Sequence, residues 1–128
     1  KNMNFPADLK YTTDHEWVRV EGNIGTIGVT DHAQGELGDV VYLDVSDSIT
    51  SVTAGESFGS IEAVKTVADL FAPISGKVVE VNRGLNDSPE QVNNDAYGEG
   101  WIIKVEMSDP SELDSLLTVD AYKELVGH

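Results

Sequence analysis

Residues 59–69 read Gly-Ser-Ile-Glu-Ala-Val-Lys-Thr-Val-Ala-Asp, and the rest of the chain is best interpreted from this stretch. Apolar, β-type runs at residues 57–64 and 66–72 flank Lys65 on both sides. Two short runs of this kind with a brief interruption between them are typical of a β-hairpin. We therefore predict a hairpin with Lys65 at its tip, where the amine is exposed on a flexible four-carbon stem.

Further short strands are predicted on either side of this hairpin. They cover residues 16–20, 24–29, 40–45, 77–81 and 101–106. Gly55 and Gly76 stand at nearly equal distances before and after Lys65, where a strand should turn. Many short strands with glycine-rich turns predict a mainly β fold, either a sandwich or a small barrel.

Helix signals are few and lie mostly near the C-terminus. Asp109 followed by Pro110 has the character of a helix N-cap and first turn, and Asp120 is predicted to cap a final short helix. Residues 31–37 are a short helix or a loop, and residues 88–90 resemble the start of a one-turn helix. We expect one domain over residues 1–128, with a β core at about 9–107 and a helical appendage at about 109–126.

The charge balance excludes several classes of partner. The chain has 128 residues, with 8 basic and 23 acidic side chains and a formal net charge of −15. Nucleic acids and anionic membranes attract basic patches, so neither is expected as a partner. The start of the chain has no secretory or transit pattern, which predicts a bacterial cytoplasm, or a mitochondrial matrix if a transit segment was removed.

No pattern of an enzyme active site is present in the sequence. The chain has no cysteine, which excludes disulfides, thiolate metal sites and a cysteine nucleophile. It has no Gly-x-Ser-x-Gly elbow and no phosphate-binding glycine loop. The three histidines lack zinc-ligand spacing, and the polar stretch at residues 82–95 lacks the alternating acids of a calcium loop.

Lys65 has two interpretations when only its neighbourhood is considered. Exposed lysines at turns are common, and most of them are simply hydrated. Lys65 is nevertheless unusual, because Lys77 is the only other lysine or arginine between positions 20 and 80. A rigid hairpin tip would also present the amine to a modifying enzyme as a defined shape, with Glu62 and Asp69 nearby to guide recognition.

A resemblance favours the second interpretation. The chain resembles the H protein of the glycine cleavage system from residue 9 to about residue 126, in unbroken order. The matching segments are Leu-Lys-Tyr (9–11), His-Glu-Trp-Val (15–18), Ile-Gly-Val-Thr-Asp-His-Ala-Gln (27–34), Leu-Gly-Asp-Val-Val-Tyr (37–42), Glu-Ala-Val-Lys (62–65), Ala-Pro-Ile-Ser-Gly-Lys-Val-Val-Glu-Val-Asn (72–82), Leu-Asn (85–86), Val-Asn (92–93) and Tyr-Gly-Glu-Gly-Trp-Ile (97–102). Three positions depart from the usual pattern, namely Ala63, Ala96 and Ser46, and Ala96 is expected to loosen its loop.

The resemblance implies a carrier protein and not an enzyme. It implies a hybrid barrel-sandwich fold with lipoate joined to Lys65 through an amide. The implied partners are a pyridoxal-phosphate glycine decarboxylase (P protein), a tetrahydrofolate-dependent aminomethyltransferase (T protein), a dihydrolipoamide dehydrogenase (L protein) and a lipoate-attaching enzyme. The carrier would take an aminomethyl group from the first to the second, and the third would reoxidise the cofactor.

The resemblance also implies a cleft that shelters the loaded arm. Glu16 matches the acid of the family's His-Glu-Trp segment, and Asp69 matches the acid that follows the lysine. Asp14 stands where some relatives have serine, and an acid there could still pair with an ammonium group. For Glu16, a solvated acid at the start of a strand is an equal alternative. His15 and His32 are interpreted as packed or surface residues without an acid–base role.

Two other carriers remain as alternatives. Lipoyl and biotinyl domains of other complexes usually have Asp-Lys-Ala or Ala-Met-Lys-Met at the hairpin, and they are shorter. An H-like protein that only donates lipoate would keep the lysine but could lose the cleft acids. The tip Val64–Thr66, the segment His15–Trp17 and the C-terminal helices favour the H protein over the first alternative. The presence of Glu16 and Asp69 favours the full cycle over the second.

Overall fold

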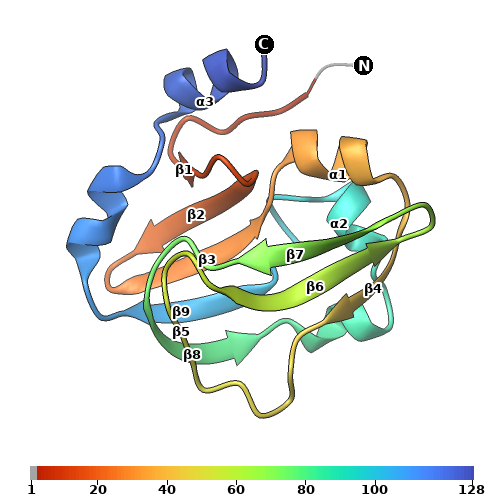
Figure 1. Ribbon diagram of the computed structural model, residues 1–128, viewed down its shortest axis with the longest axis horizontal. Coiled ribbons are helices and arrows are strands. Elements are labelled where there is room, and N and C mark those ends of the chain that lie inside the picture. Colours follow the sequence, from red (N-terminus) through yellow and green to blue (C-terminus); the bar gives the residue numbers. More distant parts are fainter. Residues whose placement is uncertain (1–2) are drawn as a thin grey trace.

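The structure is a computed structural model that describes residues 3–128. Two antiparallel sheets form the body of the molecule (Figure 1). The larger sheet has the strand order β1-β2-β3-β9-β8-β5. Its strands are β1 (Lys10–Tyr11), β2 (Glu16–Glu21), β3 (Ile24–Val29), β9 (Ile103–Met107), β8 (Gly76–Val81) and β5 (Ser51–Val52). The second sheet has the order β4-β6-β7, with β4 (Val40–Asp44), β6 (Ser57–Ala63) and β7 (Val67–Phe71). The mainly β fold is therefore confirmed.

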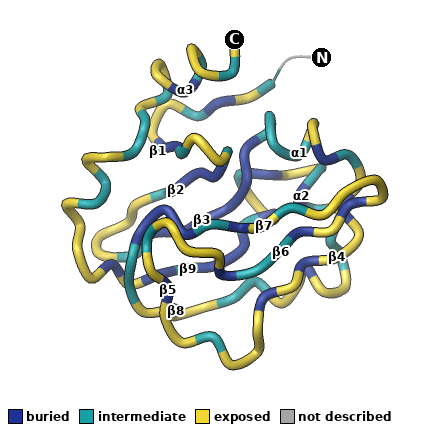
Figure 2. The backbone as a smooth tube through the Cα atoms, viewed as in Figure 1, coloured by how far each residue is buried: buried dark blue, intermediate teal, exposed yellow. Residues whose placement is uncertain are grey.

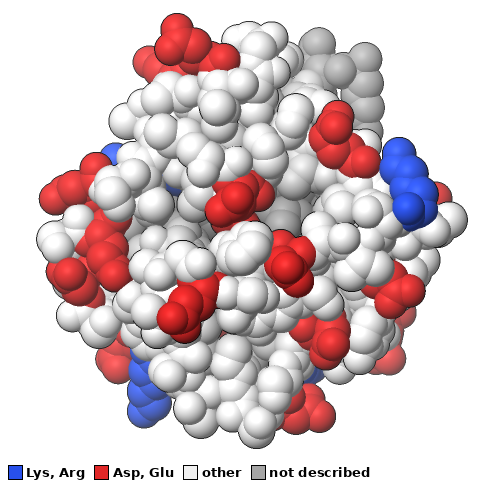
Figure 3. Space-filling model, viewed as in Figure 1, with Lys and Arg blue, Asp and Glu red and all other residues white. Residues whose placement is uncertain are grey.

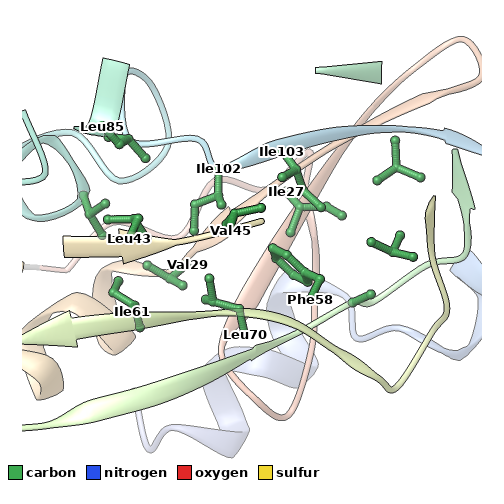
Figure 4. Close-up of a cluster of buried hydrophobic side chains, with 14 of the residues drawn as sticks. Ile27, Val29, Leu43, Val45, Phe58, Ile61, Leu70, Leu85, Ile102 and Ile103 are labelled. Carbon is green, nitrogen blue, oxygen red and sulfur yellow. The ribbon is translucent and has the colours of Figure 1, made fainter. Parts of the chain in front are cut away.

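The hydrophobic core lies between the two sheets. Inward side chains of the three-stranded sheet, such as Leu43, Ile61 and Leu70, face Ile27 and Ile103 of the larger sheet (Figure 4). All five are buried, and strands β3 and β9 run through the most buried part of the molecule (Figure 2). Burying aliphatic side chains of this size contributes about 1.5–3 kcal/mol each, so this core is the main source of stability.

A close approach of two strands explains one of the glycines in the run at residues 24–29. Gly28 lies opposite Trp17 in the β2–β3 ladder. A Cβ atom on Gly28 would lie 2.6 Å from Cζ2 of the Trp17 ring, so a side chain there would displace the ring. The Trp17 indole N–H in turn donates to the carbonyl of Ala96 at 3.1 Å. Ala96 is buried, and its carbonyl is held by this bond; the expectation of a loosened loop stays a prediction.

The helices are short and lie outside the sheets. They are α1 (Asp31–Leu37), the 3-10 turn η1 (Arg83–Asn86), α2 (Gln91–Asn94), the 3-10 turn η2 (Pro110–Ser115) and α3 (Val119–Leu125). Asp109 caps η2 as predicted, with its carboxylate accepting the Ser111 N–H. The predicted cap Asp120 is wrong. Thr118 caps α3 by accepting the Ala121 N–H, and Asp120 lies inside the first turn.

The C-terminal segment returns to the beginning of the chain. Leu117 forms a bridge with Tyr11, and α3 packs against β1 at one end of the molecule (Figure 1). The side chains there form a second, aromatic cluster of buried residues, which includes Phe5, Tyr11, Trp17 and Tyr122. The helical appendage is thus joined to the β core through aromatic packing.

Candidate functional site

Lys65 lies at the tip of the β6–β7 hairpin. The ladder runs to the pair Glu62 and Val67, and the Ala63 N–H donates to the Thr66 carbonyl at 2.8 Å to close the turn. Val64 at the tip donates its N–H to the carbonyl of Asp39 at 3.0 Å, which ties the turn to the segment after α1. Lys65 is exposed, and within residues 3–128 it takes part in no ion pair. Its amine is therefore open to a partner, while the backbone beneath it is fixed.

The stem of Lys65 leans on the end of α1. The helix begins at the N-cap Thr30 and ends at Gly38, whose backbone has φ +78°. A Cβ atom on Gly38 would lie 3.3 Å from Cε of Lys65, so the stem passes directly over this residue. A bare backbone at this position leaves room for the stem.

A cleft of about 170 Å³ opens between α1 and β7, next to this hairpin. Its lining is mostly apolar, with carboxylates among the apolar groups. The lining residues are Asp14, His15, Glu16, Val29, Ala33, Glu36, Leu37, Ile61, Ala68, Asp69 and Leu70. The structure thus brings Glu16, Asp69 and Asp14 together around one cavity, and the hairpin that carries Lys65 supplies part of its wall.

Glu16 is the buried acid of this cleft. Only 2% of its surface is exposed, and it holds two hydrogen bonds. The Thr12 hydroxyl donates to Oε1 at 2.7 Å, and the Phe71 N–H donates to Oε2 at 3.2 Å. Burial raises the pKa of Glu16 to about 7, although both hydrogen bonds act in the opposite direction. A cation that entered the cleft would favour the ionised form and pair with it.

Asp14 and Asp69 differ from Glu16 because both are exposed. Asp14 lies in the turn before β2, and Asp69 lies on β7 opposite Ser60 of β6. They stand at the rim of the cleft, where water reaches them.

The alternative interpretation of Glu16 as a solvated acid is wrong, because its side chain is buried and hydrogen-bonded.

The sequence interpretation missed Thr12. Its hydroxyl oxygen accepts the N–H groups of Asp14 and Glu16, at 3.2 and 3.0 Å, and donates its proton to the Glu16 carboxylate. Threonine followed by threonine and aspartate is a usual composition for a turn closed by a side chain. This signal predicts the turn, but it does not predict that the turn holds a buried carboxylate.

His15 and His32 are half-buried and lie against one another, with ring centroids 4.7 Å apart. The sequence interpretation of packed or surface residues agrees with these positions. His15 has the backbone angle φ +69°, which is uncommon for a residue with a side chain. Burial, together with His32, lowers the pKa of His15 below its ordinary value. His15 is thus neutral at physiological pH.

The chain has 23 acidic and 8 basic side chains. Figure 3 shows acidic side chains spread over the face viewed there, with few basic ones between them.

A larger cavity of about 370 Å³ lies beside α1. Asn93 lines this cavity, but none of the cleft acids does. Within residues 3–128 there is no cluster of metal-ligating side chains and no helix long and apolar enough to cross a membrane.

Comparison with known proteins gives consistent matches over nearly the whole chain. The family model described as glycine cleavage H-protein matches residues 9–128. A glycine cleavage system H protein of Staphylococcus haemolyticus is 54% identical over 125 residues, which cover 98% of this chain and 99% of that protein. A crystal structure of a glycine cleavage system H protein from Mycobacterium marinum superposes with a TM-score of 0.88 at 38% identity, covering 97% of this chain and all of that one. This likeness confirms the predicted hybrid barrel-sandwich fold.

Proposed function

The chain belongs to the glycine cleavage H-protein family, and we propose that Lys65 is the residue through which it carries lipoate, in amide linkage. Proteins of this family are lipoyl carriers of the glycine cleavage system and not catalysts. They take the aminomethyl group from glycine decarboxylase to the aminomethyltransferase and are then reoxidised by dihydrolipoamide dehydrogenase. The match over residues 9–128 favours this role over that of a lipoyl or biotinyl domain from another complex.

The geometry of Lys65 supports the attachment. The amine is exposed, makes no ion pair within the described residues, and stands on a turn fixed by hydrogen bonds at both Ala63 and Val64. An attaching enzyme needs such an accessible nucleophile in a reproducible position. Bound lipoate supplies a dithiolane sulfur that accepts and releases the aminomethyl group, so the chain itself needs no reactive side chain.

The cleft supports a second part of the proposal, that Glu16, Asp69 and Asp14 shelter the loaded end of the arm. A protonated amine is the charge that a buried carboxylate prefers as partner, and Glu16 has no cationic partner of its own within residues 3–128. Apolar neighbours such as Leu37, Ile61 and Leu70 exclude water from the same space. The cleft thereby protects a cationic group at the arm's end from hydrolysis.

The proposal also covers the domain, its partners and its place of action. We take residues 1–128 as one carrier domain that docks with the P, T and L proteins and with a lipoate-attaching enzyme. The bacterial relative supports a bacterial cytoplasm as the place of action. A short tether on a small acidic body raises the local concentration of the reacting group at each docked partner, so that each partner can bind weakly.

An exchange assay tests the role of Lys65. Lys65→Arg keeps the charge but removes the acylatable amine, so glycine–bicarbonate exchange with glycine decarboxylase should be lost after lipoate and attaching enzyme are supplied. Lys77→Arg is the matched control, since Lys77 is likewise exposed but lies on β8. The control should keep full exchange, and both variants should melt like the parent. Exchange that survives in Lys65→Arg would overturn the proposal.

A further inference from the structure

One hydroxyl group from the C-terminal helix reaches two elements of the cleft. The Oη of Tyr122, on α3, lies 2.8 Å from Nδ1 of His15 and 2.8 Å from Oγ1 of Thr30. These partners are 107 and 92 residues away in the sequence. The contact is therefore made only by the folded chain, and it comes from an element that does not itself line the cleft.

The two partners belong to different walls of the cleft. His15 lines it directly, between Asp14 and Glu16. Thr30 is the N-cap of α1, the helix that lines the cleft with Ala33, Glu36 and Leu37. Through one oxygen atom, Tyr122 thus joins the acid-bearing loop to the helix opposite the hairpin.

Tyr122 is well suited to hold these groups in place. Its side chain is fully buried, stacked on Tyr11 with ring centroids 4.7 Å apart and packed edge-on against Phe5. Burial raises the pKa of Tyr122 to about 12, so the hydroxyl keeps its proton at physiological pH. It can donate to one partner and accept from the other, and Thr30 still accepts the Ala33 N–H.

The backbone at His15 needs surrounding contacts to hold its conformation. Its left-handed backbone, at φ +69°, is an unfavourable conformation that persists only when surrounding contacts fix it. The His15 carbonyl accepts the Thr30 N–H at 3.0 Å, and the Tyr122 hydroxyl holds its ring. Without the hydrogen bond between Tyr122 and the His15 ring, one contact fewer would hold the turn that leads to Glu16.

We propose that Tyr122 is a positioning residue that holds the loop of Asp14, His15 and Glu16 against α1 and so keeps water away from the Glu16 carboxylate. That this benefits the loaded arm rests on the function proposed above, but the positioning itself does not. The titratable groups around Glu16 are Asp14 and His15 on its own loop, Glu36 on α1, Asp69 on β7 and Tyr122 on α3.

The test is a carboxyl NMR titration of Glu16 in the chain with unmodified Lys65. Tyr122→Phe removes the hydroxyl and keeps the ring, so water should reach the carboxylate and its titration midpoint should fall by about one pH unit toward the ordinary range. Tyr11→Phe is the matched control. It removes a hydroxyl of a buried residue of the same aromatic cluster, one that donates to the Pro6 carbonyl and has no hydrogen bond with a cleft residue within residues 3–128. An unchanged midpoint in Tyr122→Phe, or an equal fall in both variants, would overturn the proposal.

A second measurement needs no variant. In the unaltered chain, ¹⁵N NMR of the His15 ring should show Nδ1 in a hydrogen bond and a titration below the ordinary histidine range. An Nδ1 signal without the signature of a hydrogen bond would contradict the contact even if Tyr122→Phe failed to fold. Because Lys65 is unmodified in both experiments, a failure of lipoate attachment would leave these results unaffected.

Discussion

The main-chain N–H of Phe71 donates to Oε2 of Glu16 at 3.2 Å, which joins the edge strand β7 to the start of β2. Edge strands expose unpaired backbone groups, and here a carboxylate takes the place of a neighbouring strand. The same bond fixes the acid at the side of the cleft formed by the hairpin that carries Lys65. The hairpin formed by β6 and β7 therefore both holds the buried acid, through Phe71, and carries Lys65 at its tip.

Replacing Glu16 with glutamine should change how stability depends on pH. The folded pKa of about 7 lies above the ordinary value of 4.5, so between these pH values the folded chain binds more protons than the unfolded chain. The free energy of unfolding contributed by Glu16 therefore falls as pH rises through this window, by roughly 3 kcal/mol in total. Glu16→Gln cannot ionise, so the variant does not lose this free energy of unfolding as pH rises. Urea denaturation at pH 5 and pH 8 measures the difference between the variant and the parent. The stability of the variant relative to the parent should rise between the two pH values. A relative stability that is equal at both would refute the raised pKa.

Asp69→Asn should shorten the lifetime of the loaded carrier without unfolding it. Asp69 is exposed at the rim of the cleft, so its attraction for an ammonium group is modest, and hydrolytic release should rise about two- to fivefold. Ammonia release from the isolated, loaded protein measures the rate, and melting should change by less than about 0.5 kcal/mol.

The matched control for that prediction is Asp44→Asn. Asp44 lies opposite Ser60, which lies opposite Asp69, so both acids belong to one row across the three-stranded sheet. Asp44 is similarly exposed but does not line the cleft. If Asp44→Asn raised the release rate as much as Asp69→Asn, general loss of negative charge would explain the effect and the cleft would not.

Gly38→Ala should weaken both the fold and the attachment of lipoate. The backbone of Gly38, at φ +78° and ψ −159°, is accessible almost only to glycine, so alanine should cost about 1–3 kcal/mol. The added methyl group would lie 3.3 Å from Cε of Lys65, so the stem would have to shift slightly, and we expect slower modification. Gly35→Ala, inside α1, should instead stabilise the chain by about 0.5–1 kcal/mol. Urea denaturation and lipoylation rates check both, and a normal rate in Gly38→Ala would contradict the contact.

Asn93→Ala should destabilise the chain by about 2–3 kcal/mol because three hydrogen bonds are lost. The amide accepts the Val40 N–H and donates to the side chain of Gln34 and the carbonyl of Gly38. It thus joins α2 to the end of α1 on which Lys65 rests. The neighbouring Asn94 is exposed, and Asn94→Ala should change stability by less than about 0.5 kcal/mol. If the two variants had equal stabilities, the three hydrogen bonds of Asn93 would contribute nothing to the free energy of unfolding.

The strands with a clear sequence pattern are the ones that could be predicted. The hairpin around Lys65 was expected at residues 57–64 and 66–72, and the structure has Ser57–Ala63 and Val67–Phe71. Strands β1 and β5 are only two residues long, which is too short for an alternating pattern. The strand expected from residue 101 begins at Ile103, and the Trp101 carbonyl accepts a hydrogen bond from the Asn82 side chain.

The site could be predicted only in part. The resemblance matches Glu16 and Asp69 to cleft acids, and Asp14 was added where some relatives have serine. All three line one cleft, but their role remains a prediction. The burial of Glu16 had a weak signal, since alternation along β2 puts it on the same face as the buried Val18. The contact between His15 and Tyr122 joins residues 107 apart, and no local pattern encodes such a pair.

The central claim is that Lys65 alone bears the cofactor, and intact-mass spectrometry tests it most directly. The parent chain and the Lys65→Arg variant would each be produced with lipoate and an attaching enzyme. We predict one lipoyl mass increment on the parent, mapped to the peptide that contains Lys65, and none on the variant. An increment that persists in Lys65→Arg would contradict the account.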